Sequence, residues 1–135
     1  MIHRAHRFHR RSSLRYVFDR GRIVRDAHLA LRSAPNPRYD GYRMAVVVSR
    51  KVSKSAVVRN RIRRRIYEIV RRLDPPISQP YDLVFTVYNS ELATMSGEEL
   101  SKVITTILAR AHVTDTRPAM REQWHAIVKA KENGD

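Results

Sequence analysis

Residues 55 to 73 have the periodic pattern of an amphipathic helix, and this pattern constrains the fold more than any other feature of the sequence. Apolar side chains recur there every three or four positions, as on one face of a helix, and Pro75-Pro76 ends the pattern. Such a helix must bury its apolar stripe against another layer. The segments YRMAVVVS (42–49) and YDLVFTVY (81–88) are β-branched runs of strand length, so the helix is expected to lie on a sheet. The stripe consists of Val58, Ile62, Ile66, Ile69, Val70 and Leu73.

The same helix is crowded with arginine. The segment RNRIRRR (59–65) holds five arginines in seven positions, and no acidic residue occurs between Gly41 and Tyr67. Glu68 lies four residues from both Arg64 and Arg72 and can offset repulsion only there. Two explanations stand: a solvated basic face that tolerates the repulsion, or a bound anion that relieves it. On a helical wheel Asn60 and Arg64 face outward, Arg59 and Arg63 flank the apolar stripe on one side, and Arg61 and Arg65 flank it on the other.

The composition favours nucleic acid as that anion. The net charge is +14, and residues 1–67 alone hold nineteen Lys and Arg against three acids. In the stretch without acids arginine outnumbers lysine seven to two, and the guanidinium fork binds phosphate with two hydrogen bonds. A membrane surface would need exposed large apolar side chains, whereas this helix needs its apolar face for the core. The preceding loop, SRKVSKS (49–55), adds Arg50, Lys51 and Lys54.

The totals exclude several other classes. With 135 residues we expect one nucleic-acid-binding domain over 1–112, opening with a basic arm at 1–12, and a tail at 113–135 with a candidate short helix. No cysteine is present, which excludes disulfides and thiolate sites. No apolar run reaches the roughly 18 residues of a membrane span, and no signal-peptide pattern follows the basic arm, so we expect a cytoplasmic protein.

Three further elements are expected. Ser12 or Ser13 begins a short helix, and Gly21 after it would take a left-handed conformation. Residues 22–34 are extended and form one strand or more. Ser96 with Glu99 is the start of a last amphipathic helix.

Aromatic and histidine side chains near the N-terminus raise two questions of function. Phe18 belongs either to the core or to a surface on which bases stack, and Phe8 and Tyr16 are further stacking candidates. His3, His6 and His9 have metal-like spacing but no carboxylate to support it, so no metal site is expected. No arrangement of residues typical of a catalytic centre is visible.

The segment VSRKVSKSAVVRNRIRRRIYEIVR (48–71) resembles the signature of the bacterial ribonuclease P protein component. In that signature a strand and a basic pair lead into a helix that starts with Arg-Asn-Arg. LRYVFDRG (14–21) is similar to the family's aromatic-x-x-Val-Phe-x-x-Gly element. YDLVFTV and the helix expected at 97–112 resemble its last strand and last helix. The resemblance covers roughly residues 8 to 112.

The resemblance implies an α+β fold, an α-β-β-β-α-β-α two-layer sandwich with a left-handed βαβ crossover, which is an exception to the usual handedness. It implies a subunit of an RNA-based endonuclease that removes 5′ leaders from precursor tRNA. The RNA is the catalyst, so no catalytic residue is expected in the protein, and Mg²⁺ is bound mainly by the RNA. The implied partners are the ribonuclease P RNA and the 5′ leader, with no membrane and no DNA.

Carried over residue by residue, the helix contacts to the catalytic RNA are Arg59, Asn60, Arg61, Arg63 and Arg64, joined by Arg50, Lys51 and Lys54 of the loop, while Phe18 and Arg32 lie in the leader cleft. Leu14 and Arg32 stand where the family commonly has aromatics, and Tyr67 where it often has a basic residue. Leader recognition is therefore expected to depend more on charge than on stacking. The alternative is a ribosomal or other structural RNA-binding protein. A DNA-binding module is less favoured, since no recognition-helix pair is visible.

Overall fold

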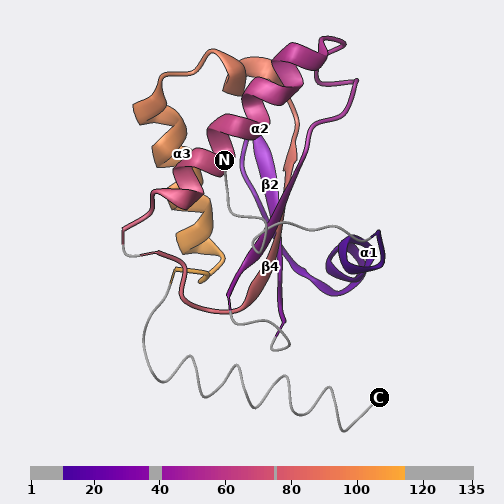
Figure 1. Ribbon diagram of the computed structural model, residues 1–135, viewed down its shortest axis with the longest axis vertical. Coiled ribbons are helices and arrows are strands. Elements are labelled where there is room, and N and C mark those ends of the chain that lie inside the picture. Colours follow the sequence, from indigo (N-terminus) through magenta and orange to yellow (C-terminus); the bar gives the residue numbers. More distant parts are fainter. Residues whose placement is uncertain (1–10, 37–40, 75, 115–135) are drawn as a thin grey trace, which may run out of the picture.

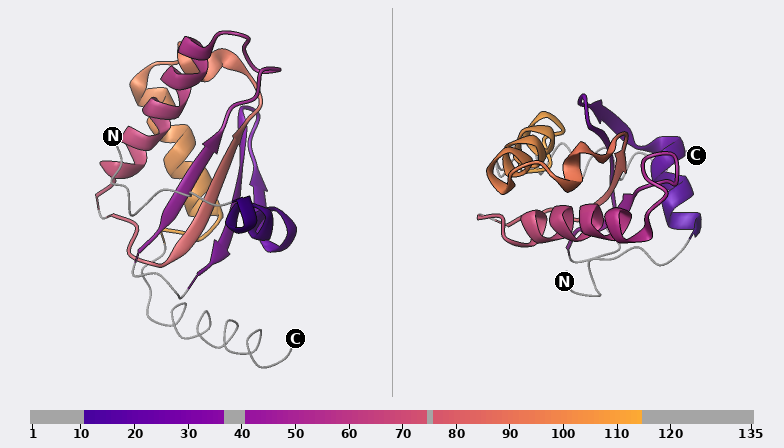
Figure 2. Two further views of the ribbon diagram at one scale, coloured as in Figure 1. Left: turned by 45° about the vertical axis from the view of Figure 1, so that its right-hand side comes forward. Right: turned by 90° about the horizontal axis from the view of Figure 1, so that it is seen from above.

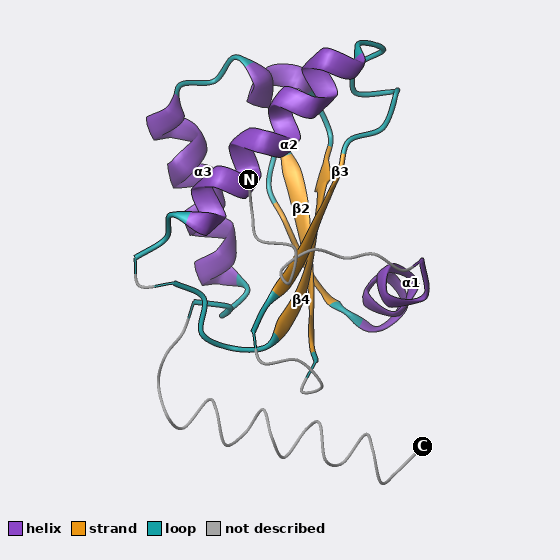
Figure 3. Cartoon of the chain, viewed as in Figure 1, coloured by secondary structure: helices purple, strands orange, loops and turns teal. Residues whose placement is uncertain are grey.

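A four-stranded sheet of order β1-β2-β4-β3 forms the centre of the computed structural model, which describes residues 11–36, 41–74 and 76–114. The pairs β1-β2 and β2-β4 are antiparallel, whereas β3 and β4 run parallel (Figure 3). This order confirms the expected α-β-β-β-α-β-α arrangement. The elements are α1 (Arg11–Arg20), β1 (Arg22–Arg25), β2 (Leu29–Pro35), β3 (Arg43–Val47), α2 (Ala56–Arg71), β4 (Tyr81–Val87), the short 3-10 helix η2 (Ser90–Ala93) and α3 (Gly97–Arg110).

The sheet has a fully covered face and a partly covered one. Alternate residues of the strands, such as Leu83 and Phe85 of β4, pack in one large core with α2 and α3. On the opposite face α1 covers only part of the sheet, and its Val17 is buried with Ala34 and Val84. Figures 1 and 2 agree that α2 and α3 lie on one side of the sheet and α1 on the other. The two-layer sandwich is confirmed, with α1 as an additional partial cover.

Helix α2 follows its sequence pattern closely. It was expected over 55–73 and begins at Ala56, after Ser55 as N-cap, with Arg72 as C-cap. Ile62, Ile66 and Val70 are buried on the stripe side. Because α2 joins the parallel strands β3 and β4, the segment is a βαβ crossover; its left-handed sense stays a prediction.

The strands at 22–34 and the two ends of α3 can also be compared with the predictions from the sequence. Residues 22–34 form two strands, β1 and β2, and not one. Ser96 caps α3 by accepting a hydrogen bond from the Glu99 amide at 3.1 Å. The chain leaves α3 through a bond from the Val113 amide to the Leu108 carbonyl, and the buried Val113 extends the core past the end of the helix.

Parts of the predicted arm and tail lie outside the described residues, namely 1–10 and 115–135. The histidine triplet, Phe8 and the candidate tail helix all lie there. Within the residues that are described, no helix is long and apolar enough to cross a membrane.

A buried ion pair joins the two parallel strands on the α1 side of the sheet. The Arg43 guanidinium donates to both carboxylate oxygens of Asp82, at 3.0 and 2.9 Å, and the Asn36 amide donates to the same carboxylate at 2.8 Å. Arg43 and Asp82 are register partners across β3 and β4 and are both buried. Each charge therefore requires the other, because a lone buried charge is strongly destabilising.

Candidate nucleic-acid interface

The loop between β3 and α2 is held in place by hydrogen bonds of its own. The Val52 amide donates to the Ser49 carbonyl at 3.1 Å, and the Ser55 side chain accepts from the Val58 amide at 3.3 Å. Ser55 has extended dihedral angles, as an N-cap requires. The loop thus delivers its basic side chains directly beside the first turn of α2.

Arg59 is the one predicted contact residue with a clear internal role. Its Nη1 donates to the carbonyls of Ser53 at 2.9 Å and Lys54 at 3.1 Å, and the residue is half-buried. These bonds lock the loop onto the helix. A sequence pattern cannot show this, because the acceptors are backbone groups of a loop whose shape is unknown beforehand.

The other predicted residues lie on the loop between β3 and α2 and on the first half of α2, and we call this set the α2 basic surface. Five of its cations are exposed, and within the described residues none of the five has an ion pair or a side-chain hydrogen bond. The Asn60 amide oxygen accepts from Arg63 Nη2 at 2.5 Å, which orients that guanidinium along the helix. The surface comprises Arg50, Lys51, Lys54, Asn60, Arg61, Arg63 and Arg64; the five exposed cations are all of these except Asn60 and Arg63.

The single carboxylate of this helix serves its last turn and not its first two. Glu68 accepts from Arg71 Nη2 at 2.8 Å and lies 3.3 Å from Arg72 Nε, while Arg64 has no such contact within the described chain. The Arg71 guanidinium holds the pKa of Glu68 at about 2. The expected proximity of Glu68 to Arg72 is confirmed, whereas within the described chain Glu68 makes no ion pair with Arg64. Repulsion on the first two turns therefore stays uncompensated.

Arg65, placed beside the apolar stripe by the wheel, is a structural residue. It donates to the carbonyls of Leu92 at 2.7 Å and Met95 at 2.5 Å, and so fastens α2 to η2 and the turn that follows it. Tyr67, at the position where the family often has a basic residue, packs against the core. The arginines of α2 thus fall into three groups: those that bind backbone carbonyls, those that bind a side chain of the same helix, and those that face solvent without a partner in the described chain. These groups are Arg59 and Arg65, Arg63 and Arg71, and Arg61 and Arg64.

A second candidate contact region lies on the α1 side of the sheet. The Arg32 guanidinium carbon is 4.5 Å from the centre of the Phe18 ring, and Arg32 Nη1 is 3.5 Å from Thr86 Oγ1. Phe18 is 42% exposed, so of the two alternatives for this residue the core role is wrong. The structure therefore brings the two predicted cleft residues together, and it adds Thr86, which the sequence did not indicate.

Gly21 sets how closely α1 approaches this region. The expected left-handed conformation was wrong, since no described glycine has a positive φ. A Cβ at this position would instead meet the Val17 carbonyl oxygen at 2.3 Å and the Ser33 carbonyl oxygen at 3.2 Å. The residue is glycine because backbone passes where a side chain would begin.

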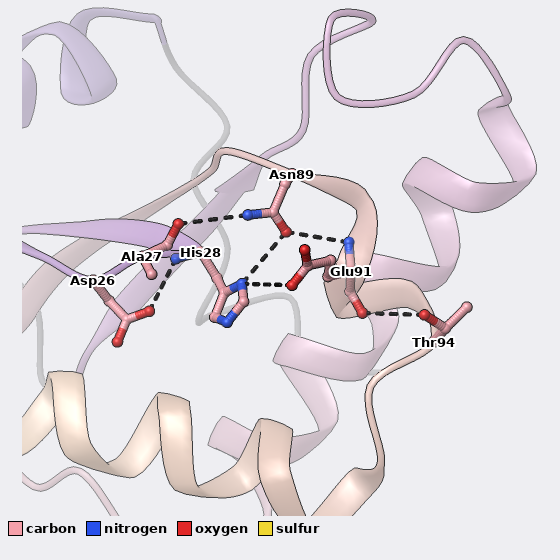
Figure 4. A network of polar contacts seen from close by, with 6 residues as sticks. All are labelled: Asp26, Ala27, His28, Asn89, Glu91 and Thr94. Atoms are coloured by element: carbon pink, nitrogen blue, oxygen red, sulfur yellow. Dashed lines mark hydrogen bonds and ion pairs between the residues drawn. The ribbon is translucent and has the colours of Figure 1, made fainter.

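A search for a metal site can be made only among the residues that the structure describes. Across 11–36, 41–74 and 76–114, no three His, Asp or Glu side chains gather in a group that could hold a metal ion. His28 belongs instead to a polar network at the β1–β2 turn (Figure 4), where its Nδ1 lies 3.4 Å from both Asn89 Oδ1 and Glu91 Oε2. This network links the turn to η2.

The comparisons with known proteins agree with the geometry. Residues 2–112 match the family model described as Ribonuclease P. The ribonuclease P protein component of Chloroflexus aggregans is 36% identical over 115 residues, which cover 85% of this chain and 84% of that protein. The ribonuclease P protein component of Brevibacillus brevis is 31% identical over 117 residues, which cover 87% of this chain and 91% of that protein.

Solved structures show the same fold. The RNase P protein of Staphylococcus aureus superposes with a TM-score of 0.72 at 20% identity, covering 82% of this chain and 98% of that one. The RNase P protein from Thermotoga maritima superposes with a TM-score of 0.69 at 24% identity, and the match covers 77% of this chain and 96% of that one. The chain therefore belongs to the ribonuclease P protein family and is the protein component of that ribonucleoprotein endoribonuclease.

Proposed function

We propose that the α2 basic surface binds the ribonuclease P RNA, while the α1 side of the sheet binds the 5′ leader of precursor tRNA. The observation that carries the first half is the set of five exposed cations without ion pairs in the described chain. Three of them are arginines, the residue best suited to phosphate oxygens. A phosphate backbone would relieve a repulsion that Glu68 leaves in place on the first two turns.

The second half is supported by the pair Phe18 and Arg32. One face of the guanidinium lies over the ring, and Thr86 holds its edge, which leaves planar surface for a base and positive charge for a phosphate. Phe18 belongs to α1, which lies on the other side of the sheet from α2 (Figure 1), and Arg32 contacts Phe18. Two RNA segments can therefore be bound at the same time, one on each side.

In this proposal the protein positions the RNAs and the RNA performs the cleavage. The Mg²⁺ ions that cleavage needs would be held mainly by RNA phosphates. Binding of the leader adds affinity for the precursor over the mature product. Since both partners are RNAs of the cytoplasm, the protein would act there.

Reconstitution tests the proposal. The purified chain is added to a bacterial ribonuclease P RNA at low Mg²⁺, and release of the 5′ leader from precursor tRNA is followed. We expect a clear rise in cleavage rate over the RNA alone. If the chain binds the RNA without raising cleavage at any Mg²⁺ concentration, it is a structural RNA-binding protein and the proposed function is wrong.

A further inference from the structure

On the α1 side of the sheet, the side chains of β4 become more exposed toward the carboxyl end of the strand. Val84 is fully buried beneath α1, Thr86 is half-exposed, and Tyr88 is 47% exposed. The Tyr88 amide donates to the His28 carbonyl at 2.8 Å, which continues the β2–β4 pairing by one residue. Because Val87 points into the main core, the side chain of Tyr88 falls on the opposite face, the one that carries Phe18 and Arg32.

A single exposed aromatic on a protein surface needs no explanation, but Tyr88 has a distinctive neighbourhood. Strands β3 and β4 are parallel, so their carboxyl ends lie at the same end of the sheet. Tyr88 follows β4 there, and the loop at 49–55 follows β3. That loop presents Arg50, Lys51 and Lys54, all exposed. Within the described residues the Tyr88 hydroxyl has no hydrogen-bond partner. An accessible ring on the open face of the sheet, at the end where a basic loop begins, is a surface on which a base of a single-stranded nucleic acid can stack.

The backbone around Tyr88 is fixed by the network in Figure 4. The next residue, Asn89, donates to the Ala27 carbonyl at 3.5 Å and accepts from the Glu91 amide at 3.2 Å. The two carboxylates at this edge are engaged by His28, whose amide binds Asp26 and whose ring lies beside Glu91. The ring of Tyr88 is therefore presented from a rigid support.

We propose that Tyr88 is a second base-stacking position for single-stranded RNA, so that the strand runs from Phe18 and Arg32 toward the loop at 49–55. This inference rests on the proposed binding of the leader. Arg32 is the register partner of Val84, and Tyr88 lies four residues further along the chain, or about 13 Å at strand rise. That span corresponds to at most about four stacked nucleotides.

The test uses the reconstituted holoenzyme and precursor tRNAs whose leaders are lengthened one nucleotide at a time. For long leaders, Tyr88→Ala should lower affinity by about 5- to 150-fold, the range for loss of one stacked base. Tyr88→Leu should lose affinity similarly, because it keeps an apolar side chain but no ring, whereas Tyr88→Phe should bind like the parent. Tyr88→Phe is thus the matched control, because it keeps the exposed ring at the same position and removes only the hydroxyl.

Leader length separates this inference from the proposal on which it rests. The effects of Tyr88→Ala and Phe18→Ala should appear at leader lengths that differ by about two to four nucleotides. Equal affinity of Tyr88→Ala and the parent at every length would overturn the second stacking position, as would an equal loss on tRNA without a leader. The proposed leader binding itself fails only if the parent holoenzyme gains no affinity from any leader.

Discussion

The double substitution of Arg61 and Arg64 by Ala tests whether the α2 basic surface binds RNA. These two positions are chosen because, among the residues that the structure describes, their side chains make no contact that stabilises the fold. Both side chains are exposed and, in the described chain, without a partner, so the change removes two charges and no internal bond. Each lost phosphate contact lowers the slope of log affinity against log salt by about 0.7 to 0.9. The double variant should therefore have a slope smaller by about 1.4 to 1.8.

That difference in slope is large enough to measure. Between 50 and 200 mM salt the parent should lose about 7 to 12 times more affinity for ribonuclease P RNA than the variant does. The assay is equilibrium binding of the RNA at four or more salt concentrations, with melting temperature as the check of folding. Stability should stay within a few tenths of a kcal/mol, because removal of like charges one turn apart is slightly favourable.

The matched control is the pair Arg71→Ala and Arg72→Ala on the last turn of the same helix. These two arginines are also exposed but share Glu68, so their removal should change the slope much less. Equal changes for both pairs would refute the reasoning, since affinity would then follow total charge and not the uncompensated first turns. Arg59 is left unchanged because its loss would also free the loop at 49–55.

Three further predictions concern the fold that supports the two regions. Gly21→Ala should destabilise by about 1–3 kcal/mol and reduce leader-dependent affinity by displacing α1, since the new Cβ meets backbone at 2.3 Å; an unchanged melting temperature would contradict this. Asp82→Ala should cost about 3–5 kcal/mol in denaturant unfolding, because buried Arg43 loses its carboxylate, and a cost under 1 kcal/mol would show the pair to be dispensable. The pKa of Glu68 is lowered to about 2 from 4.5 by Arg71, so its contribution to stability is present above pH 4.5 and is lost as the pH falls through 2. Glu68→Gln should therefore be less stable than the parent at pH 7 and equal to it below pH 2 in thermal melts.

Much of the fold could be predicted from local patterns. The apolar period of α2 and the cap of α3 depend only on neighbours in sequence, and both elements lie within one or two residues of their predicted starts. The role of an arginine depends on what lies across space. Arg65 binds carbonyls 27 and 30 residues away, and Arg43 pairs with a carboxylate 39 residues away, yet in sequence both look like members of the basic surface.

In the candidate site too, the sequence indicated residues whose role depends on charge but not contacts that depend on the fold. Charge indicated the exposed cations of the loop and of α2, but charge alone did not separate them from Arg59, which binds carbonyls of the loop. The stacking of Arg32 on Phe18 requires the register of β2 and the close approach that Gly21 permits, so the sequence indicated both residues without their contact. Tyr88 was missed because a tyrosine at the end of a strand is ordinary until the topology places it on the open face.

The central claim is that the two sides of the sheet hold two different RNAs, and site-specific crosslinking tests it most directly. The sequence has no cysteine, so Arg64→Cys and Phe18→Cys each provide a single attachment point for a photoreactive group. In the holoenzyme with precursor tRNA bound, we expect position 64 to crosslink to ribonuclease P RNA and position 18 to the 5′ leader. Crosslinks from both positions to the same RNA, or with the two partners exchanged, would contradict the account.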